Sequence, residues 1–462
     1  MRGLDLRVEA GERVLLLAPS GAGKSTLLAA LAGLLDPGTA GQAEGELRVD
    51  GRDPRAARER TGILFQDPES QLVMARAGDE VAFGLENRCV PAVEIWPRVD
   101  RALTQVGFGY GRDRPTDALS GGEQQRLALA GTFALGPRLL LLDEPTANLD
   151  PAGAALVRRS LMEILADRSL TLVMVEHRLA EALPLVERAI VLEAGGGVVA
   201  DGPPDEVFAQ RGEQLAAAGV WVPDRPLVAP RRRSQPARIP MLVAESLAYR
   251  YPGEPAAAVD GVGLQLDSGE VLAIVGANGS GKSTLALLLG GLLTPTLGSV
   301  MAGMGMAGSP PGPLGKWPAR QLAAHVGSVF QDPEHQFLTE RVGDELRIGP
   351  LRAGLSSAEA QVRVDELLVR LHLDHLADAN PFTLSGGEKR RLSVATALAA
   401  GPAVLLLDEP TFGQDRRTAV ELLELLAQLR DAGSALAIVT HDQPFAAALA
   451  DRTVRLENGR LA

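Results

Sequence analysis

The chain has 462 residues, which is too long for one ordinary hydrophobic core, so two or three domains are expected. Hydrophobic residues make up 46% and aromatic residues only 3%, which indicates an aliphatic, well-packed interior rather than a disordered chain. The net charge of −12 argues against a broad nucleic-acid-binding surface. The single cysteine, Cys89, excludes a disulfide scaffold and a multi-cysteine zinc site, and it fits a reduced cytosol.

No part of the sequence predicts a membrane span. No run approaches the roughly 18–20 apolar residues that a spanning helix needs. The first residues, "MRGLDLRVEAGE", lack the apolar core of a secretory signal. We therefore expect a cytosolic chain whose membrane work, if any, goes through a partner.

The first half alternates short aliphatic runs with helical segments. "RVLLLA" (13–18) leads into "APSGAGKST" (18–26) and a helix, and "RLLLLD" (138–143) and "TLVMV" (171–175) are further buried strands. Between "FQDPESQ" (65–71) and the signature phrase "LSGGEQQR" (119–126) the pattern turns polar and helical. The segment predicts a parallel sheet with a helical sublobe inserted into it.

The second half repeats the same motifs in the same order. Lys24 and Lys282 are 258 residues apart, Ser120 and Ser385 are 265 apart, and His177 and His441 are 264 apart. "FQDPEHQ" (330–336), "LSGGEKRR" (384–391) and "LLLDEPT" (405–411) complete the second set. The chain is therefore one domain duplicated. We expect a first domain at 1–210, a linker at 211–240 that is rich in proline and arginine, and a second domain at 241–462.

The glycine-rich turns predict phosphate binding. A strand–loop–helix with this spacing points backbone N–H groups at phosphate oxygens at the positive end of a helix dipole. The first loop has Ala18 where the second has Gly276, so it is expected to be strained or reshaped if that position needs positive φ. The predicted nucleotide-binding residues of the loops are Ser20, Gly21, Ala22, Gly23, Lys24, Ser25, Thr26, Gly276, Asn278, Gly279, Ser280, Gly281, Lys282, Ser283 and Thr284.

Carboxylates at the ends of buried strands predict phosphoryl-transfer chemistry. Phosphoryl transfer needs positioning and charge compensation more than covalent catalysis. The predicted Mg²⁺ ligands are Ser25, Gln66 and Asp143 in the first half and Ser283, Gln331 and Asp408 in the second. The predicted catalytic residues are Glu144 and Glu409, which would orient and deprotonate water, with His177 and His441 at the γ-phosphate and Gln66 and Gln331 at the start of each sublobe.

The phrase "LSGGE" offers a serine hydroxyl and backbone donors at a helix start. Because each domain's phosphates are already held by its own glycine-rich loop, the expected target is the γ-phosphate held by the other copy. The residues concerned are Ser120, Gly121, Gly122, Ser385, Gly386 and Gly387.

Taken in order, these motifs resemble the nucleotide-binding domain of ABC ATPases over both halves of the chain. The resemblance implies two P-loop NTPase domains of α/β class, each a mostly parallel sheet with an antiparallel β edge and an inserted helical sublobe. It also implies a fused pseudo-dimer that closes head-to-tail around ATP and Mg²⁺, so that Lys24 shares a site with Ser385 and Lys282 with Ser120. Asp150 and Asp415 would be the D-loop aspartates, although "FGQD" departs from the usual small-residue form.

The family stacks adenine on an aromatic residue ahead of the first strands. Tyr251 in "YRYPG" matches that position in the second domain. The counterpart in the first domain would fall before Met1, which a misplaced start codon would explain.

"FQDPESQ", "FQDPEHQ", "GDEVAFGLEN" (78–87) and "VEHR" resemble the fused ATPases of energy-coupling-factor importers, which take up vitamins and cobalt or nickel ions. The resemblance implies a transmembrane coupling protein docked beside the Q-loops, which are the loops that begin at Gln66 and Gln331. It also implies a small membrane substrate-binding protein, no nucleic-acid partner, and a place on the cytoplasmic face of the membrane. Two alternatives remain open: a tandem ATPase of a sugar importer, and a soluble tandem ABC protein acting on ribosomes.

Overall fold

In the computed structural model the chain forms two compact units that divide close to Arg225. The structure describes residues 3–19, 21–35, 44–66, 69–147, 149–166, 168–193, 195–230, 232, 238–306 and 308–462. Helix α7 (Pro204–Ala217) continues through the first seven residues of the expected linker, so the first unit extends past residue 210. The described residues from 218 to 239 form no helix or strand, as proline-rich sequence favours.

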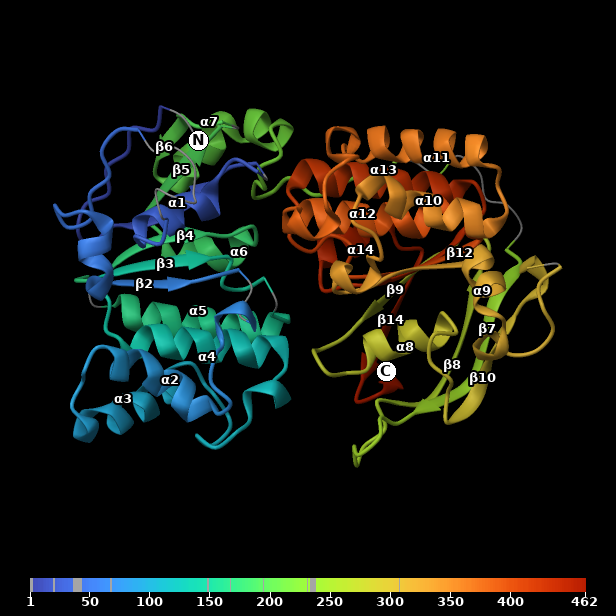
Figure 1. The fold of residues 1–462 in the computed structure, drawn as a ribbon, viewed down its shortest axis with the longest axis horizontal. Coiled ribbons are helices and arrows are strands. Elements are labelled where there is room, and N and C mark those ends of the chain that lie inside the picture. The colour runs from blue at the N-terminus through green and yellow to red at the C-terminus, as the bar shows by residue number, and fades with distance from the viewer. Residues whose placement is uncertain are drawn as a thin grey trace. The chain divides into compact units, whose positions relative to one another are not determined.

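The first unit is built on a six-stranded sheet in the order β2-β3-β4-β1-β5-β6 (Figure 1). Five strands are parallel, and β6 pairs antiparallel with β5 at the edge. The strands are β1 (Arg13–Leu17), β2 (Thr61–Leu64), β3 (Leu139–Asp143), β4 (Thr171–Val175), β5 (Arg188–Leu192) and β6 (Val198–Gly202).

Both faces of this sheet are buried, which explains its continuous aliphatic strands. Val14 and Leu16 of β1 pack toward Leu28 of α1, whereas Leu15 and Leu17 pack into the core shared with the sublobe helices. Figure 1 shows α1 on one side of the sheet and α4 and α5 on the other. The helices are α1 (Lys24–Leu31), α2 (Ala77–Asn87), α3 (Ala92–Gln105), α4 (Gly121–Ala134), α5 (Pro151–Leu165) and α6 (Leu179–Ala182), with short 3₁₀ turns η1 (Pro54–Arg60), η2 (Glu69–Gln71), η3 (Thr116–Ala118) and η4 (Leu183–Leu185).

The second unit repeats this topology in a sheet of order β11-β12-β13-β9-β14-β15. Its antiparallel edge strand is β15, paired with β14. The strands are β9 (Val271–Val275), β11 (Val326–Val329), β12 (Val404–Asp408), β13 (Ala435–Val439), β14 (Arg452–Glu457) and β15 (Arg460–Leu461). The expected fold class is confirmed in both halves.

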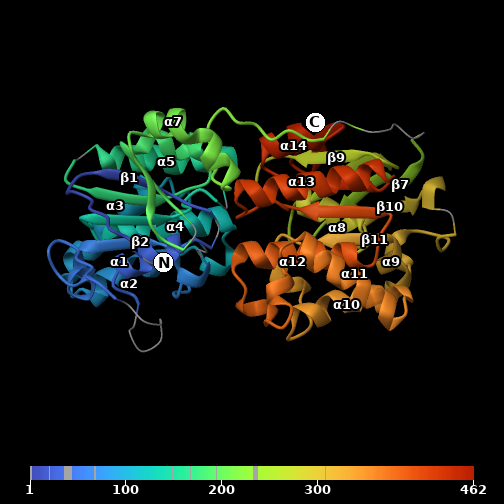
Figure 2. The same cartoon turned by 90° about the horizontal axis from the view of Figure 1, so that it is seen from above.

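The helices of the second unit again separate into sheet-covering helices and a sublobe. Helices α10, α11 and α12 pack against one another, as Figures 1 and 2 both show. The helices are α8 (Lys282–Leu289), α9 (Ala319–His325), α10 (Val342–Ala353), α11 (Ser357–Arg370), α12 (Gly386–Ala399), α13 (Arg416–Asp431) and α14 (Gln443–Leu449), with 3₁₀ turns η5 (Met304–Met306), η6 (Leu314–Lys316), η7 (Pro333–Gln336), η8 (Asp374–Leu376) and η9 (Pro381–Thr383).

An additional antiparallel sheet distinguishes the second unit. Its order is β10-β7-β8, formed by β7 (Pro240–Tyr249), β8 (Val259–Asp267) and β10 (Leu297–Ala302). Its buried residues, such as Leu242 and Leu266, join the core beneath β9 and α8. Among the described residues of the first unit no such sheet is present. This sheet carries the strand that leads to Tyr251.

Candidate active site

The strand order brings the predicted motifs together at one edge of each sheet. In the first unit, the strands that end at Gln66, Asp143, His177 and the glycine-rich loop are β2, β3, β4 and β1, which are consecutive neighbours. Because parallel strands place their carboxyl ends at the same edge, these loops meet in one crevice. The same order, β11-β12-β13-β9, holds in the second unit.

The two loop lysines are buried and fold back onto their own loops. Lys24 donates from Nζ to the carbonyl oxygens of Ala18 at 2.9 Å and Pro19 at 3.2 Å, and Lys282 donates to that of Ala277 at 2.8 Å. Burial lowers the pKa of Lys24, although Glu144 and Asp143 oppose this effect. A terminal phosphate would replace these carbonyls as the partner of each ammonium group.

Glycine is required at the turn into each helix. Gly23 and Gly281 occupy the N-cap positions of α1 and α8 with φ of 91° and 97°, in the left-handed region that favours glycine. A Cβ on Gly281 would lie 2.0 Å from the carbonyl oxygen of Ala258. The loops therefore hold the backbone shape that phosphate binding needs.

The first loop is reshaped rather than strained at its opening position. Ala18 is not among the residues with positive φ, whereas Gly276 has φ of 157° and closely approaches Leu456 and Ser280. A Cβ at Gly276 would lie 2.3 Å from the Leu456 carbonyl oxygen and 2.7 Å from Ser280 Oγ. The first loop also has Ala22 where the second has Ser280. The replacement of the opening glycine by alanine is therefore accompanied by loss of the serine that the glycine approaches. Ser20 lies outside the described residues.

The predicted Mg²⁺ ligands of the first unit are brought together. The Ser25 hydroxyl hydrogen-bonds the Asp143 carboxylate, whose pKa burial raises. The Gln66 amide hydrogen-bonds Glu144. In the second unit, the Ser283 hydroxyl likewise bonds Asp408, and Asp408 Oδ1 is buried with no hydrogen-bond partner. A buried carboxylate oxygen beside a hydroxyl suits a hard divalent cation, so these residues fit Mg²⁺.

Both predicted catalytic glutamates have a strained backbone. Glu144 and Glu409 each adopt φ of 50°, a region that non-glycine residues occupy at a cost. Their N–H groups bond to the last carbonyls of the neighbouring strands, from Val175 and Val439, at 2.8 Å and 2.9 Å. The same outlier at two matched positions indicates that the backbone geometry serves the site.

In the first unit the predicted catalytic glutamate is paired with the predicted histidine. His177 Nε2 lies 3.2 Å from Glu144 Oε1. Burial pushes the pKa of Glu144 up, but His177, Lys24 and the Gln66 amide outweigh it and hold the pKa below its usual value. Burial likewise acts to lower the pKa of His177, and attraction and hydrogen bonding to Glu144 raise it instead.

In the second unit the corresponding pair is looser. His441 Nε2 and Glu409 Oε1 are 3.4 Å apart, and that oxygen accepts no hydrogen bond. Glu409 Oε2 accepts from the His441 N–H at 3.2 Å and the Thr440 hydroxyl at 3.1 Å. Burial dominates here and raises the pKa of Glu409 to about 7. The second glutamate is therefore much closer to protonation at neutral pH.

The sequence interpretation overlooked a buried carboxylate beside the histidine of the first unit. Glu176 is buried beside His177, and its oxygens accept from the Thr146 hydroxyl at 2.6 Å and from the N–H groups of His177 and Arg178. The second unit has Thr440 at that position. There, Asp442 accepts from the matched hydroxyl of Thr411 at 3.1 Å.

The mismatch between "VEHR" and "VTHD" was the available signal. Aligning the two copies shows that the carboxylate lies before the histidine in one and after it in the other. The shifted carboxylate therefore distinguishes Glu176 as a residue in which the two sites differ.

The predicted signature serines cap their helices at exposed positions. Ser120 precedes α4 and forms a capping box with Glu123, and Ser385 precedes α12 and forms one with Glu388. Both serines, with Gly121 and Gly386, are exposed on their own units, whereas Gly122 is buried and Gly387 half-buried. Their pairing with the other unit's phosphate site stays a prediction.

The remaining predicted residues lie at the margins of each site. Tyr251 donates or accepts a hydrogen bond with Thr284 at 3.2 Å, so the aromatic ring lies beside the second glycine-rich loop. Its ring contacts Tyr249 edge to face at 5.0 Å. Asp150 caps α5 through the Gly153 N–H at 2.7 Å, and Asp415 directly precedes α13.

The chain matches the family model described as "ABC transporter" over residues 1–147 and 259–412. It belongs to the ABC transporter family. Its two domains are ABC ATPase domains that bind and hydrolyse ATP, and the expected enzyme class is confirmed.

Two relatives match this ABC protein over almost its whole length. YkoD of Bacillus subtilis, provisionally named as an HMP/thiamine import ATP-binding protein, is 35% identical over 99% of this chain and 87% of its own length. A protein of Bifidobacterium longum, provisionally named as an ABC transporter ATP-binding protein, is 38% identical over 98% of this chain, which spans only 62% of that relative.

A solved structure shares the tandem fold. The archaeal ribosome recycling factor aABCE1, in complex with the archaeal ribosomal stalk protein aP1, matches with a TM-score of 0.66 at 22% identity, covering 99% of this chain and 86% of that one. At this identity the match shows the fold alone.

No helix in the described part of the chain is long and apolar enough to cross a membrane. Within the same residues, no group of three or more histidine, cysteine or acidic side chains forms a metal cluster. The predicted Mg²⁺ ligands are instead one carboxylate, one hydroxyl and one amide per site.

Proposed function

We propose that this ABC protein energises an importer of the energy-coupling-factor type for a vitamin, a vitamin precursor or a transition-metal ion. The observation that carries the proposal is the 35% identity, over 99% of the chain, to a protein provisionally named for HMP/thiamine import. The complete set of catalytic groups in both domains supports an energising role rather than a regulatory one.

Each domain supplies its own set of groups for ATP hydrolysis. Lys24 and Lys282 would neutralise the β- and γ-phosphates, and the loop N–H groups would hold the phosphate oxygens. Glu144 and Glu409 would orient the attacking water and take its proton, and His177 and His441 would contact the γ-phosphate. A bound Mg²⁺ would neutralise charge on the β- and γ-oxygens.

Three residues in each domain would hold that Mg²⁺. They are Ser25, Gln66 and Asp143 in the first domain and Ser283, Gln331 and Asp408 in the second.

The exposed signature serines favour closure of the two domains around ATP. A capped helix start presents N–H groups and a positive dipole end to an incoming anion. In the proposed arrangement Ser385 would complete the site of Lys24, and Ser120 that of Lys282. Fusion raises the effective concentration of each domain for the other.

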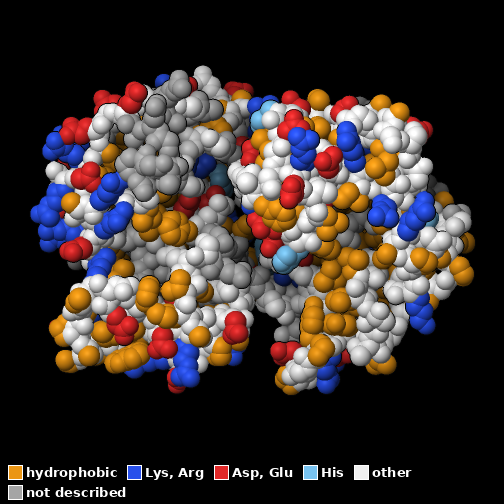
Figure 3. All heavy atoms as spheres, viewed as in Figure 1, with side chains coloured by type: hydrophobic (Ala, Val, Ile, Leu, Met, Phe, Trp, Pro, Cys, Tyr) orange, Lys and Arg blue, Asp and Glu red, His pale blue; other side chains and the backbone are white. Residues whose placement is uncertain are grey.

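Matched apolar side chains beside the Q-loops support a membrane partner. Val73 follows η2 with 64% of its surface exposed, and its counterpart Leu338 follows η7 with 77% exposed. Figure 3 also shows hydrophobic side chains gathered over α2 and α3, where Phe83, Val93 and Trp96 are exposed. Exposed apolar patches of this kind mark interaction surfaces. We propose that a transmembrane coupling protein docks here and holds the chain at the cytoplasmic face of the membrane.

The test is reconstitution with the membrane proteins encoded by neighbouring genes. The expected result is co-purification with a coupling protein and a small substrate-binding membrane protein, and ATP-dependent uptake of labelled thiamine precursor, thiamine or cobalt into vesicles. Uptake of a sugar instead would favour the alternative importer class.

Two substitutions and a control locate the docking surface. Val73→Asp and Leu338→Asp are expected to abolish co-purification while ATP binding persists. Leu297→Asp, on β10 and 70% exposed, is the control that should keep the partner. Retention of the partner by both Q-loop variants would contradict the proposed surface.

A further inference from the structure

An arginine on the second signature helix binds the Q-loop backbone. Arg390 lies on α12, is only 3% exposed, and donates to the carbonyl oxygens of Phe330 at 2.6 Å and Gln331 at 2.5 Å. Two hydrogen bonds from one buried guanidinium fix the direction of both peptide groups. Gln331 is the residue whose side chain is predicted to contact Mg²⁺.

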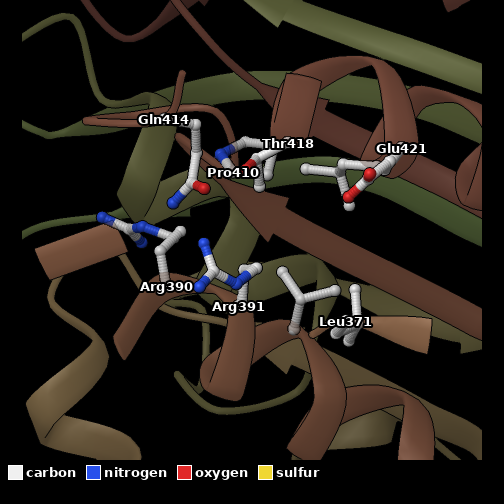
Figure 4. Close-up of a pocket in the computed structure, with 9 residues that line it drawn as sticks. Leu371, Arg390, Arg391, Pro410, Gln414, Thr418 and Glu421 are labelled. Carbon is white, nitrogen blue, oxygen red and sulfur yellow. The ribbon is translucent and has the colours of Figure 1, made fainter. Parts of the chain in front are cut away.

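Further contacts from the same helix involve the Q-loop and the loop after β12. The Arg390 guanidinium lies 5.9 Å from the centre of the Phe412 ring. Gln414 donates from Nε2 to the Gly387 carbonyl oxygen at 3.1 Å, and Lys389 pairs with Glu334 of η7 at 2.6 Å. Figure 4 shows the amide of Gln414 turned toward the guanidinium groups of Arg390 and Arg391.

The first domain lacks this set of contacts. The residues at the positions of Arg390, Phe412 and Gln414 are Gln125, Ala147 and Leu149. Gln125 is fully buried, and neither its Oε1 nor its Nε2 makes a hydrogen bond. Three positions that touch one another in the second domain are therefore all different in the first.

The space among these residues is too small to bind a ligand. The cavity lined by Arg390, Arg391, Gln414 and Leu371 has a volume of about 10 Å³, room for roughly one water molecule. The contacts therefore serve positioning rather than recognition of a small molecule.

We propose that Arg390 is a positioning residue that ties the second Q-loop, the second signature helix and the loop after β12 into one rigid unit. The backbone of Gln331 would then be held in place in the second domain, whereas in the first domain Gln66, whose amide bonds Glu144, has no arginine at the position of Arg390 to hold its backbone. The two ATP sites would therefore differ in how firmly the glutamine that is predicted to contact Mg²⁺ is held. This consequence rests on the roles proposed for Glu144 and Glu409.

The direct test is hydrogen exchange of the full-length chain. Arg390→Gln, which installs the first domain's residue, is expected to speed exchange across 330–336 about ten-fold or more, as loss of two charge-assisted hydrogen bonds implies. Arg390→Lys should give an intermediate rate, since one ammonium cannot serve two carbonyls in fixed geometry. Arg347→Gln, an exposed arginine of the same sublobe, is the control and should leave the segment unchanged. Unchanged exchange in Arg390→Gln would overturn the proposal.

ATPase kinetics identify the residue through which Arg390 acts. In a Glu144→Gln background, Arg390→Gln should lower kcat about ten-fold with KM for ATP within two-fold. Adding Gln331→Ala should cause no further loss, because both substitutions remove one effect. Action through Gln331 would be overturned if Arg390→Gln lowered kcat only in the Glu409→Gln background, or if its effect and that of Gln331→Ala were fully additive. If Glu144→Gln alone abolished ATP turnover, that result would count against two independent sites. The hydrogen-exchange measurement would then still decide the role of Arg390.

Discussion

His177 Nε2 lies 3.2 Å from Glu144 Oε1, and this contact makes the proposed catalytic glutamate of the first domain part of a buried ion pair. The matched residues of the second domain are 3.4 Å apart, and the glutamate oxygen that faces the histidine accepts no hydrogen bond. The two domains carry the same proposed catalytic residue types, but their surroundings shift the pKa of the glutamate in opposite directions.

Both glutamates are expected to be needed for full turnover. Glu144→Gln and Glu409→Gln remove the proposed base from one site each, and loss of a general base costs roughly 100-fold or more at that site. Each single variant should therefore lose at least half of the steady-state ATPase rate, and the double variant nearly all of it. Unchanged turnover in either single variant would contradict two hydrolytic sites. Retained ATP binding, measured by fluorescence titration, controls for misfolding.

The same two substitutions should shift stability in opposite directions without nucleotide. The native pKa of Glu409 is about 7, above the ordinary glutamate value of 4.5, so between these pH values the folded state holds a proton that the unfolded state has lost. Stability therefore falls as pH rises through that window, and the carboxylate is unfavourable above it. Glu409→Gln removes this cost and should stabilise the second domain by on the order of 2 kcal/mol at pH 8, with little effect at pH 4.5.

The stability effect of Glu144→Gln provides the comparison for that of Glu409→Gln. Its pKa is held below the usual value by His177 despite burial, so its charged form stabilises the fold at neutral pH and that contribution is lost as pH falls. Glu144→Gln should lower the melting temperature of the first domain at pH 7. Calorimetry of the full chain checks both signs, and a stabilised Glu144→Gln variant would contradict the ion-pair interpretation.

The position of the carboxylate beside each histidine should be exchangeable. Glu176→Thr leaves the Thr146 hydroxyl and the His177 N–H without their acceptor, whereas the new hydroxyl can accept from the Arg178 N–H as Thr440 does from that of Asp442. The substitution should cost about 1–3 kcal/mol. Adding Arg178→Asp recreates the order of the second domain, in which Asp442 binds Thr411. The double variant should recover a substantial part of the loss in a chemical-denaturation experiment. No recovery would show that the two arrangements are not interchangeable.

Tyr251 should matter for one nucleotide site only. Its hydroxyl is 3.2 Å from Thr284, next to the second glycine-rich loop. Loss of one base–aromatic stack costs roughly 1–3 kcal/mol, so Tyr251→Ala should weaken ATP binding there about ten-fold. Measuring ATP binding in Lys24→Ala and Lys282→Ala backgrounds resolves the two sites. Equal weakening at both sites would contradict the assignment.

Much of the architecture could be predicted because the repeats constrain one another. "RVLLLA" and "RLLLLD" became β1 and β3, and the strand order placed the four motif loops side by side, as a parallel sheet requires. The His177–Glu144 contact also follows from neighbouring strand ends.

Other features depend on contacts between segments far apart in the sequence. The unequal pKa values of the two glutamates arise from burial, which His177, Lys24 and Gln66 outweigh in the first domain only, and no motif encodes that balance. The role of Arg390 depends on carbonyls 60 and 59 residues away, and only the fold brings them together. The predicted linker start at 211 is too early, because α7 continues to Ala217.

The turn into α8 offers a test of the phosphate loop that leaves every proposed catalytic side chain in place. Gly281→Ala would put a Cβ 2.0 Å from the Ala258 carbonyl oxygen at φ of 97°, so the loop must move. The variant is expected to lose ATP binding at the second site by at least 100-fold. Gly312→Ala is the matched control, because its φ of 91° carries a similar backbone penalty of roughly 1–2 kcal/mol, its Cβ meets nothing within 4 Å, and it lies outside the glycine-rich loop. If Gly312→Ala proved as damaging as Gly281→Ala in an ATP titration, the backbone penalty alone, rather than the close approach to Ala258, would account for the loss of binding.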